Sequence, residues 1–209
     1  MESERNAGHP KTRQCDSMTT EQYHRLSLWG QAPMRALLHW WQELDRARGD
    51  RASLRRCHTL AEVVLTPAFN RLRIDLARFG ELDSNGIARL AVVAGVLAHV
   101  TPPADEGMLE GMLAPRLPGA IARQMAIPPP DGTRSPVSEL RFRRVLAIPE
   151  SEREALFAAM VRLVRHLGGT SAQVDAPSLA RGIFHWNQKT KQTWAFAYYE
   201  AAPKNESPR

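Results

Sequence analysis

Apolar side chains recur at steps of three and four residues along most of this 209-residue sequence, and this period constrains the fold more than any other feature. The first such stripe consists of Met34, Leu37, Leu38, Trp41 and Leu44. Further stripes follow over residues 66–76, 84–97, 151–167, 175–186 and 194–199. Almost nothing alternates with the period of two that a half-buried strand requires. The period therefore predicts an all-α protein.

Polar residues at the ends of these stripes indicate where the helices begin. Thr66 precedes a proline at the first helical position, and Ser151 is followed three residues later by Glu154, which is the pattern of a capping box. We expect side-chain caps from Asp50, Thr66, Ser84, Ser138 or Ser135, Ser151 and Asp175.

Changes in composition divide the chain into an N-terminal helical part and a C-terminal helical bundle. Residues 1–32 are polar and lack periodicity, so we expect a disordered extension. Residues 33–127 form the N-terminal helical domain, and the proline-rich residues 128–137 are the best candidate for a linker. The C-terminal bundle covers residues 138–202 and is followed by a tail over residues 203–209.

The charge balance favours a polyanionic partner without identifying one. Lys and Arg number 28 against 22 Asp and Glu, which gives a net charge of +6, although a basic protein that binds nothing is equally compatible with this number. The two cysteines, Cys15 and Cys57, supply neither a disulfide framework nor a zinc-binding spacing. No apolar run reaches the roughly 20 residues that span a bilayer. We therefore expect a cytoplasmic protein with no membrane partner.

No group of residues suggests catalysis. Cys57 and His58 are adjacent, but neighbouring residues on a helix point about 100° apart, so a core cysteine beside a surface histidine is the favoured interpretation. Glu62, Asp75 and Glu81 show no pairing that acid and base catalysis would require. We expect no enzymatic activity, no cofactor and no metal.

Arginines are concentrated in two helical stretches, one in each half of the chain. In "SELRFRRVL" the apolar residues share one face, while Arg141 and Arg144 lie three residues apart on another, with Arg143 between them. "DRASLRRC" repeats this design with Arg55 and Arg56. Side-by-side guanidinium groups suit phosphates one nucleotide apart.

A structural role for these arginines is an open alternative, because the arginines of the second stretch could pair with Glu139 or Glu150 and only solvate the helix. Lys189 and Lys191 are weaker candidates for nucleic-acid contacts, since a lysine in a loop is usually only solvated.

Aromatic residues on the helical stripes favour core packing over base stacking. Trp29 and Trp40 lie off the main stripe, so they are either exposed contact points or covered by the N-terminal segment. The aromatic residues that we assign to the core are Trp41, Phe69, Phe142, Trp186, Trp194 and Tyr198.

Taken together, the helical stretches resemble the CasB family, the small subunit of the type I-E CRISPR surveillance complex called Cascade. Four landmarks carry the resemblance, in the family's order: "LLHWWQELDRARGDRASLRRC", "TPAFNRL", "SELRFRRVL" and "VDAPSLARGIFHWNQKTKQTWAFAYY". The resemblance covers roughly residues 34–200 and rests on diffuse helix patterns, so its specificity comes from their combination and spacing.

The resemblance implies an all-helical, non-catalytic protein that is present as two head-to-tail copies beside the other Cascade subunits. It also implies contacts with the crRNA and with the target and non-target DNA strands of the R-loop. Arg56 and Arg141 stand where the family uses basic residues, whereas Arg55, Arg143 and Arg144 follow from their helical placement. The alternative from another class is a helical adaptor that docks an acidic protein and makes no nucleic-acid contact.

Overall fold

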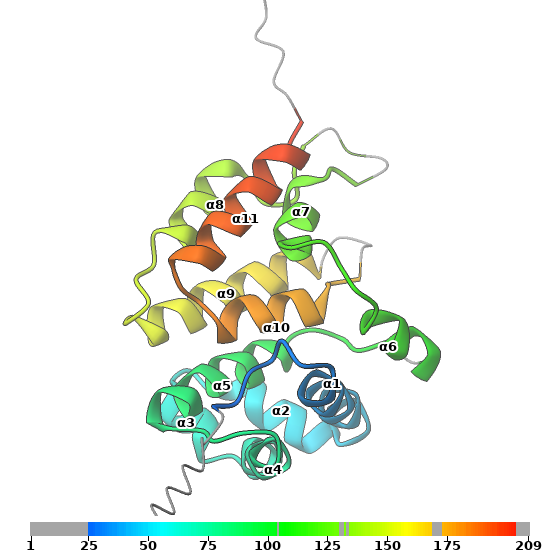
Figure 1. The fold of residues 1–209 in the computed structure, drawn as a ribbon, viewed down its shortest axis with the longest axis vertical. Helices are drawn as coiled ribbons and strands as arrows, with labels where there is room; N and C mark the ends of the chain where they lie inside the picture. Colours follow the sequence, from blue (N-terminus) through cyan, green and yellow to red (C-terminus); the bar gives the residue numbers. More distant parts are fainter. Residues whose placement is uncertain (1–24, 104, 130–131, 133, 169–172, 204–209) are drawn as a thin grey trace, which may run out of the picture.

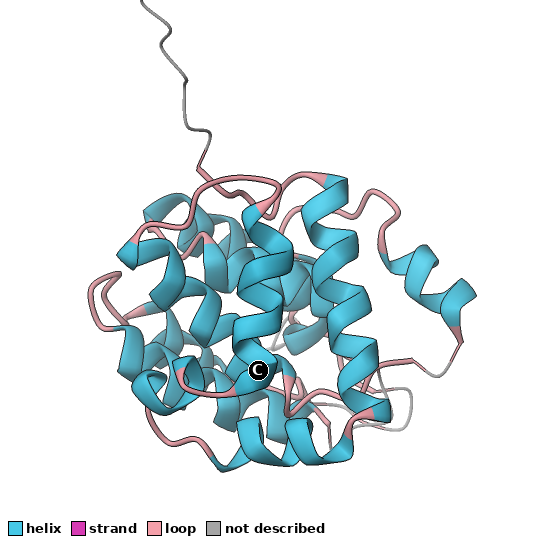
Figure 2. Cartoon of the chain, turned by 90° about the horizontal axis from the view of Figure 1, so that it is seen from below, coloured by secondary structure: helices cyan, strands magenta, loops and turns pink. Residues whose placement is uncertain are grey.

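The computed structural model describes residues 25–103, 105–129, 132, 134–168 and 173–203. Within these residues the regular structure is helical, and Figure 2 shows helices joined by loops. The one extended pairing in this part of the chain is an isolated bridge between Arg25 and Glu81. The prediction of an all-α protein is confirmed.

The helices form two groups that are stacked along the long axis of the molecule (Figure 1). The lower group contains α1 (Gln31–Arg46), α2 (Arg48–Arg56), α3 (Leu60–Val64), α4 (Pro67–Ala77), α5 (Ser84–Leu97) and α6 (Glu106–Met112). The upper group contains α7 (Ala120–Ala126), α8 (Glu139–Leu146), α9 (Arg153–Leu167), α10 (Ala176–Phe184) and α11 (Gln188–Ala201).

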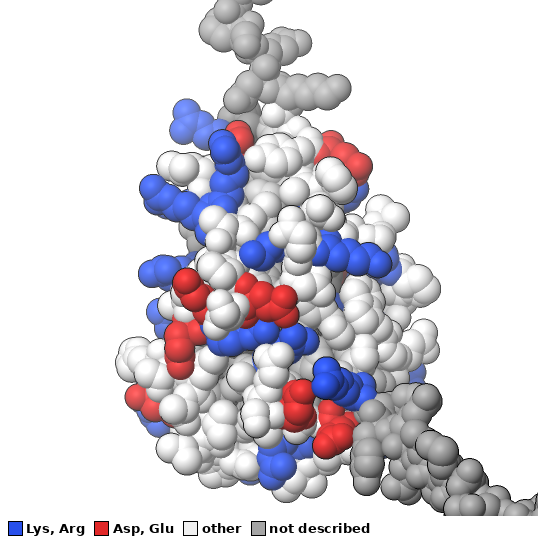
Figure 3. All heavy atoms as spheres, turned by 60° about the vertical axis from the view of Figure 1, so that its left-hand side comes forward, with Lys and Arg blue, Asp and Glu red and all other residues white. Residues whose placement is uncertain are grey.

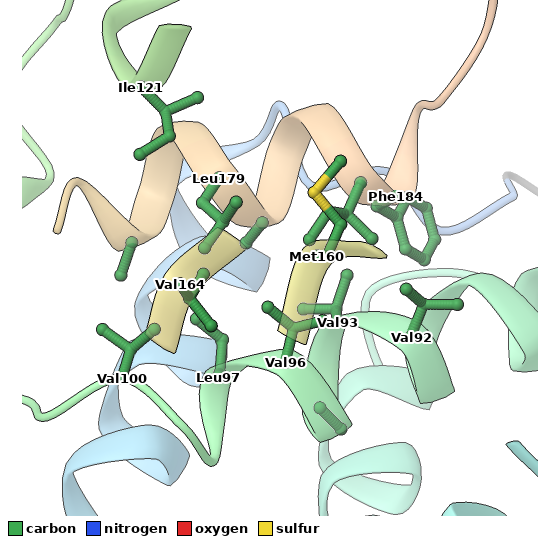
Figure 4. Packing of buried hydrophobic residues seen from close by; sticks show 14 of the residues in the cluster. Val92, Val93, Val96, Leu97, Val100, Ile121, Met160, Val164, Leu179 and Phe184 are labelled. Atoms are coloured by element: carbon green, nitrogen blue, oxygen red, sulfur yellow. The ribbon is translucent and has the colours of Figure 1, made fainter. Parts of the chain in front are cut away.

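Helix α5 joins the two groups, because every residue of its second half is buried. Figure 4 shows its valines and Leu97 packed against side chains of α9 and α10, and its other side contacts α3 and α4. A Cβ at Gly95 would lie 2.6 Å from Cε2 of Phe157, so only glycine permits the close approach of α5 to α9. The second half of α5 is apolar all round and must be covered on all sides, so one hydrophobic core runs through both groups.

Helix α7 belongs to the upper group, although its residues lie within the range that we assigned to the N-terminal domain. It packs against α10 and α11. The end of the proline-rich segment closes the same region, since the Val137 amide donates to the Met125 carbonyl at 3.0 Å and the Tyr198 hydroxyl donates to the Val137 carbonyl at 2.6 Å. The chain thus crosses between the groups before α7, not at residues 128–137.

Ordered packing begins earlier than residue 33, so the extension that we expected is too long. Leu26 and Leu28 are buried, and the Leu26 amide donates to the Glu81 carbonyl at 2.9 Å. Arg181 Nε donates to the Leu28 carbonyl at 3.1 Å, which ties this segment to α10. Residues 1–24 lie outside the described residues.

The helix caps agree with the sequence in part. Thr66 and Asp175 accept hydrogen bonds from the amides of Phe69 and Ser178, as predicted. The caps predicted from Asp50 and Ser84 are wrong, because Asp50 lies within the first turn of α2 and Asp83 caps α5 in place of Ser84.

The capping box predicted from Ser151 and Glu154 is also wrong, because tertiary structure gives Glu154 another partner. Its carboxylate oxygens accept from the Leu60 amide at 3.0 and 3.2 Å, at the start of α3. A capping box that we did not predict forms there, between Thr59 and Glu62. For Ser138, which does precede α8, no side-chain cap forms.

The six aromatic residues assigned to the core are all buried, as predicted. Trp40 is buried as well, and its indole donates to the Ala68 carbonyl at 3.0 Å, whereas Trp29 is 65% exposed. Among the described helices, none is both long enough and apolar enough to cross a membrane.

Candidate nucleic-acid interface

A groove of about 740 Å³ separates α8 from α9 and holds a cluster of basic side chains. Phe142 turns to the core, whereas Arg141 and Arg144 line the groove from α8 together with the buried Val145. Small alanines on α9 give the groove its width, and Arg162 and His166 line its opposite wall. The residues that line this groove include no Asp or Glu.

Arg141, Arg144 and Arg162 form no ion pair with any carboxylate in the described part of the chain. Arg141 Nη1 lies 3.3 Å from Nε2 of His166. His166 Nε2 also lies 2.6 Å from the Pro136 carbonyl, which can only accept, so Nε2 must carry the proton and donate. It offers Arg141 no acceptor, and these guanidinium groups keep their charge for an anion from outside the chain.

Arg143 faces the other way and carries out the structural role that was the alternative for this stretch. It pairs with Glu139 one helical turn away, at 3.7 Å. The Tyr199 hydroxyl donates to the same carboxylate at 3.2 Å. Glu150, the other acid that we considered, pairs instead with Arg89 and Arg153.

A second basic cavity, of about 480 Å³, lies between the two helix groups. Arg55 lines it from the end of α2 and Arg165 from α9, and no acidic residue lines it. Arg165 Nε donates to Nδ1 of His99 at 3.4 Å. Burial, together with the positive charges of Arg165, Arg55 and Arg51, lowers the pKa of His99 to about 4. The imidazole is therefore neutral at pH 7, and the fixed charge of this cavity is that of the two lining arginines.

Helix α9 connects the two basic cavities. Arg162 lines the groove beside α8 and Arg165 lines the cavity beside α2, and residues three apart on a helix are surface neighbours. The fold therefore brings the two arginine stretches of the sequence to the two flanks of one helix. Arg162 and Arg165 were not among the predicted residues, although their spacing is the same as that of Arg141 and Arg144.

The other predicted residues lie elsewhere. Arg56 is exposed on α2 but lines neither of the two basic cavities. Lys189 and Lys191 lie in the first turns of α11, not in a loop, and Lys189 lines a third cavity. Lys191 Nζ donates to the Ile148 carbonyl at 2.5 Å and lies 5.5 Å from the Trp186 ring centre, so it has a structural role.

Figure 3 shows the side of the molecule that carries α8 and the start of α9 in Figure 1, where basic and acidic side chains both occur. Lys and Arg side chains stand along the upper left edge of this view, and Asp and Glu side chains form a band below them. An extended polyanion would be attracted to the upper region and repelled from the band.

Cys57 and Glu62, which we considered as a nucleophile and an acid, have structural roles. Burial raises the pKa of Cys57, and its thiol donates to the Ser53 carbonyl at 3.4 Å, which disfavours the reactive thiolate. Backbone amides of His58 and Thr59 donate to the Glu62 carboxylate, and these hydrogen bonds lower its pKa. Both groups thus stabilise the turn between α2 and α3.

A comparison with family models matches residues 50–199 to CRISPR-associated protein Cse2, the family also called CasB. The search of curated proteins finds no match to this chain. The matched range contains both arginine stretches and all of α9, whereas most of the first landmark lies before it. Since the match covers well over half of the sequence, the chain belongs to the Cse2 family.

Proposed function

We propose that this protein is a non-catalytic Cascade subunit that holds nucleic acid through the two arginine-lined cavities on the flanks of α9. Membership of the Cse2 family implies a subunit of the type I-E Cascade complex. The observation that carries the nucleic-acid contact is the α8–α9 groove, where three arginines lack carboxylate partners in the described chain. Guanidinium groups in this state bind phosphate oxygens in pairs of parallel hydrogen bonds.

Such contacts favour the backbone of a strand and do not depend on its sequence. The exchange of a DNA duplex for an RNA–DNA heteroduplex is close to balanced, so modest backbone contacts can tip it towards the open R-loop. In this proposal the arginines stabilise the crRNA paired with the target strand, the displaced non-target strand, or both, while the guide selects the sequence. The other Cascade subunits and a second, head-to-tail copy of this chain are the proposed protein partners.

The second candidate is a helical adaptor, because the same unpaired arginines could dock an acidic protein surface. A mobility-shift titration with unrelated single- and double-stranded DNA at two salt concentrations separates the two. Binding that ignores sequence and weakens steeply with salt supports the nucleic-acid function. Absence of binding at both concentrations, together with an unchanged R-loop in the next experiment, would leave the adaptor as the better explanation.

The assembled complex provides the second test. Arg55→Ala combined with Arg141→Ala removes one arginine from each cavity, and both side chains are exposed, so helical circular dichroism should not change. R-loop lifetime should shorten in the complex that contains this variant. Loss of helical signal instead would mean that the two arginines support the fold.

A further inference from the structure

A third cavity, of about 520 Å³, lies at the surface where the segment that contains Leu28 and Trp29 crosses α10. The Trp29 indole and the His185 ring line one part of it. Gly119, Gly182 and Pro118 line another part, beside Trp194, whose ring packs closely against Gly182. The groove and the cavity on the flanks of α9 use none of these residues.

Trp29 is exposed but held in place. Its ring stacks on His185 with centres 5.5 Å apart and planes 25° from parallel. Its amide donates to the Ser27 hydroxyl at 3.3 Å, which itself lies 3.4 Å from Nε2 of His185. The hydrogen bond from Arg181 to the Leu28 carbonyl fixes the residue before it. An indole that is 65% exposed and fixed in orientation offers a ready stacking surface.

The charged side chains that line this cavity are all basic, namely Arg116, Arg181 and Lys189. One carboxylate lies nearby, since Arg116 Nε is 3.5 Å from Asp175, but Asp175 does not line the cavity and its side chain is 10% exposed. Lys189 is exposed and has no carboxylate partner among the described residues. The cavity thus combines an aromatic wall with a cationic rim, which suits a flat ring attached to an anion.

We propose that this cavity binds one unstacked base of a single-stranded nucleic acid. The base would stack on Trp29, and Lys189 with Arg116 would contact the adjoining phosphates. Stacking on an aromatic side chain accepts any base, so the contact is independent of sequence like those of the arginines beside α9. This inference rests on the proposed nucleic-acid function and adds a contact to the base itself.

The test compares two probes by fluorescence anisotropy, a labelled oligothymidylate and an oligomer of equal length with an abasic backbone. Trp29→Ala should weaken binding of the oligothymidylate roughly 5- to 150-fold, the loss of one stacked base, and leave the abasic oligomer unaffected. Trp29→Phe should restore most of the affinity, because it restores a ring. Phe196→Ala is the matched control, since Phe196 is 68% exposed on α11 and lines none of the three cavities.

The outcomes separate this inference from the function on which it rests. Equal affinity of the wild-type protein and Trp29→Ala for the oligothymidylate would overturn the base contact and leave the arginine contacts standing. Failure of the wild-type protein to bind either probe would overturn the inference, and together with an unchanged R-loop in the assembled complex it would overturn the proposed function as well. A third outcome is that the oligothymidylate does not bind at Trp29, while an acidic aromatic peptide quenches the fluorescence of Trp29. This result would assign the cavity to a protein segment and overturn the inference.

Discussion

The salt dependence of binding gives the sharpest test of the α8–α9 groove. We expect Arg141→Ala combined with Arg144→Ala to remove two phosphate contacts, because both side chains line the groove and neither has a carboxylate partner in the described chain. For a single strand, the loss of one phosphate contact reduces the slope of the logarithm of the binding constant against the logarithm of the salt concentration by about 0.7. The double variant should therefore have a slope that is smaller by about 1.4, which corresponds to about 25-fold in affinity over a tenfold change in salt.

The matched control removes the same charge from arginines that already have partners. Arg143 pairs with Glu139, and Arg35 pairs with Glu110 at 3.2 Å. Arg35→Ala combined with Arg143→Ala should keep the wild-type slope, apart from a small effect of net charge. The measurement is fluorescence anisotropy with a labelled oligothymidylate over a series of salt concentrations.

An equal loss of slope in both double variants would contradict phosphate contacts in the groove, since net charge and not the groove would then govern binding. An unchanged slope in the groove variant would place the phosphate contacts elsewhere. Thermal melting of both variants checks that neither change acts through the fold.

Three further predictions concern stability. Glu154→Ala should lower the free energy of unfolding in urea by roughly 0.5–2 kcal/mol, the range for a lost helix cap, whereas Ser151→Ala should leave it unchanged; the reverse order would restore the capping box that the sequence suggests. The pKa of His99 is about 4 in the folded protein and near 6.5 in the unfolded chain, so between these pH values the unfolded chain binds one proton more than the folded protein. The free energy of unfolding of the wild-type protein should therefore fall as the pH falls from 6.5 towards 4. His99→Gln should reduce that fall, as measured by urea titrations. Deletion of residues 1–28 removes two buried leucines and should lower the free energy of unfolding in urea by roughly 3–6 kcal/mol, whereas deletion of residues 1–24 keeps both leucines. Equal stability of the two deletion variants would show that the burial of these leucines contributes nothing.

Much of the secondary structure could be predicted from the sequence, because apolar period and caps such as Thr66 act over a few residues. Short α3 was missed because five residues hold less than two turns of the period. Its start depends on Glu154, which is 94 positions away in the sequence. A hydrogen bond over that separation leaves no local pattern in the sequence. Glu154 was therefore predicted to cap its own helix, α9, whereas it caps the start of α3.

For the candidate site, too, local features could be predicted from the sequence, and contacts between distant segments could not. Arg141 and Arg144 could be predicted as a pair, since their shared helix face follows from spacing alone. The pairing of Arg143 with Glu139 is equally local, since the two residues lie four apart on α8, and the sequence offered it as the alternative role. Only the structure decided that Arg143 has a carboxylate partner while Arg141 and Arg144 do not.

An all-α fold and two stretches with exposed arginines follow from the sequence alone, because helical period and charge are local properties. That Arg55 and Arg141 lie on the two flanks of α9, each near an arginine of that helix, depends on the tertiary structure. It decided this through the burial of α5, whose apolar surface must be covered on every side by helices from both halves of the chain. That requirement involves the whole core at once, and no short stretch of the sequence expresses it.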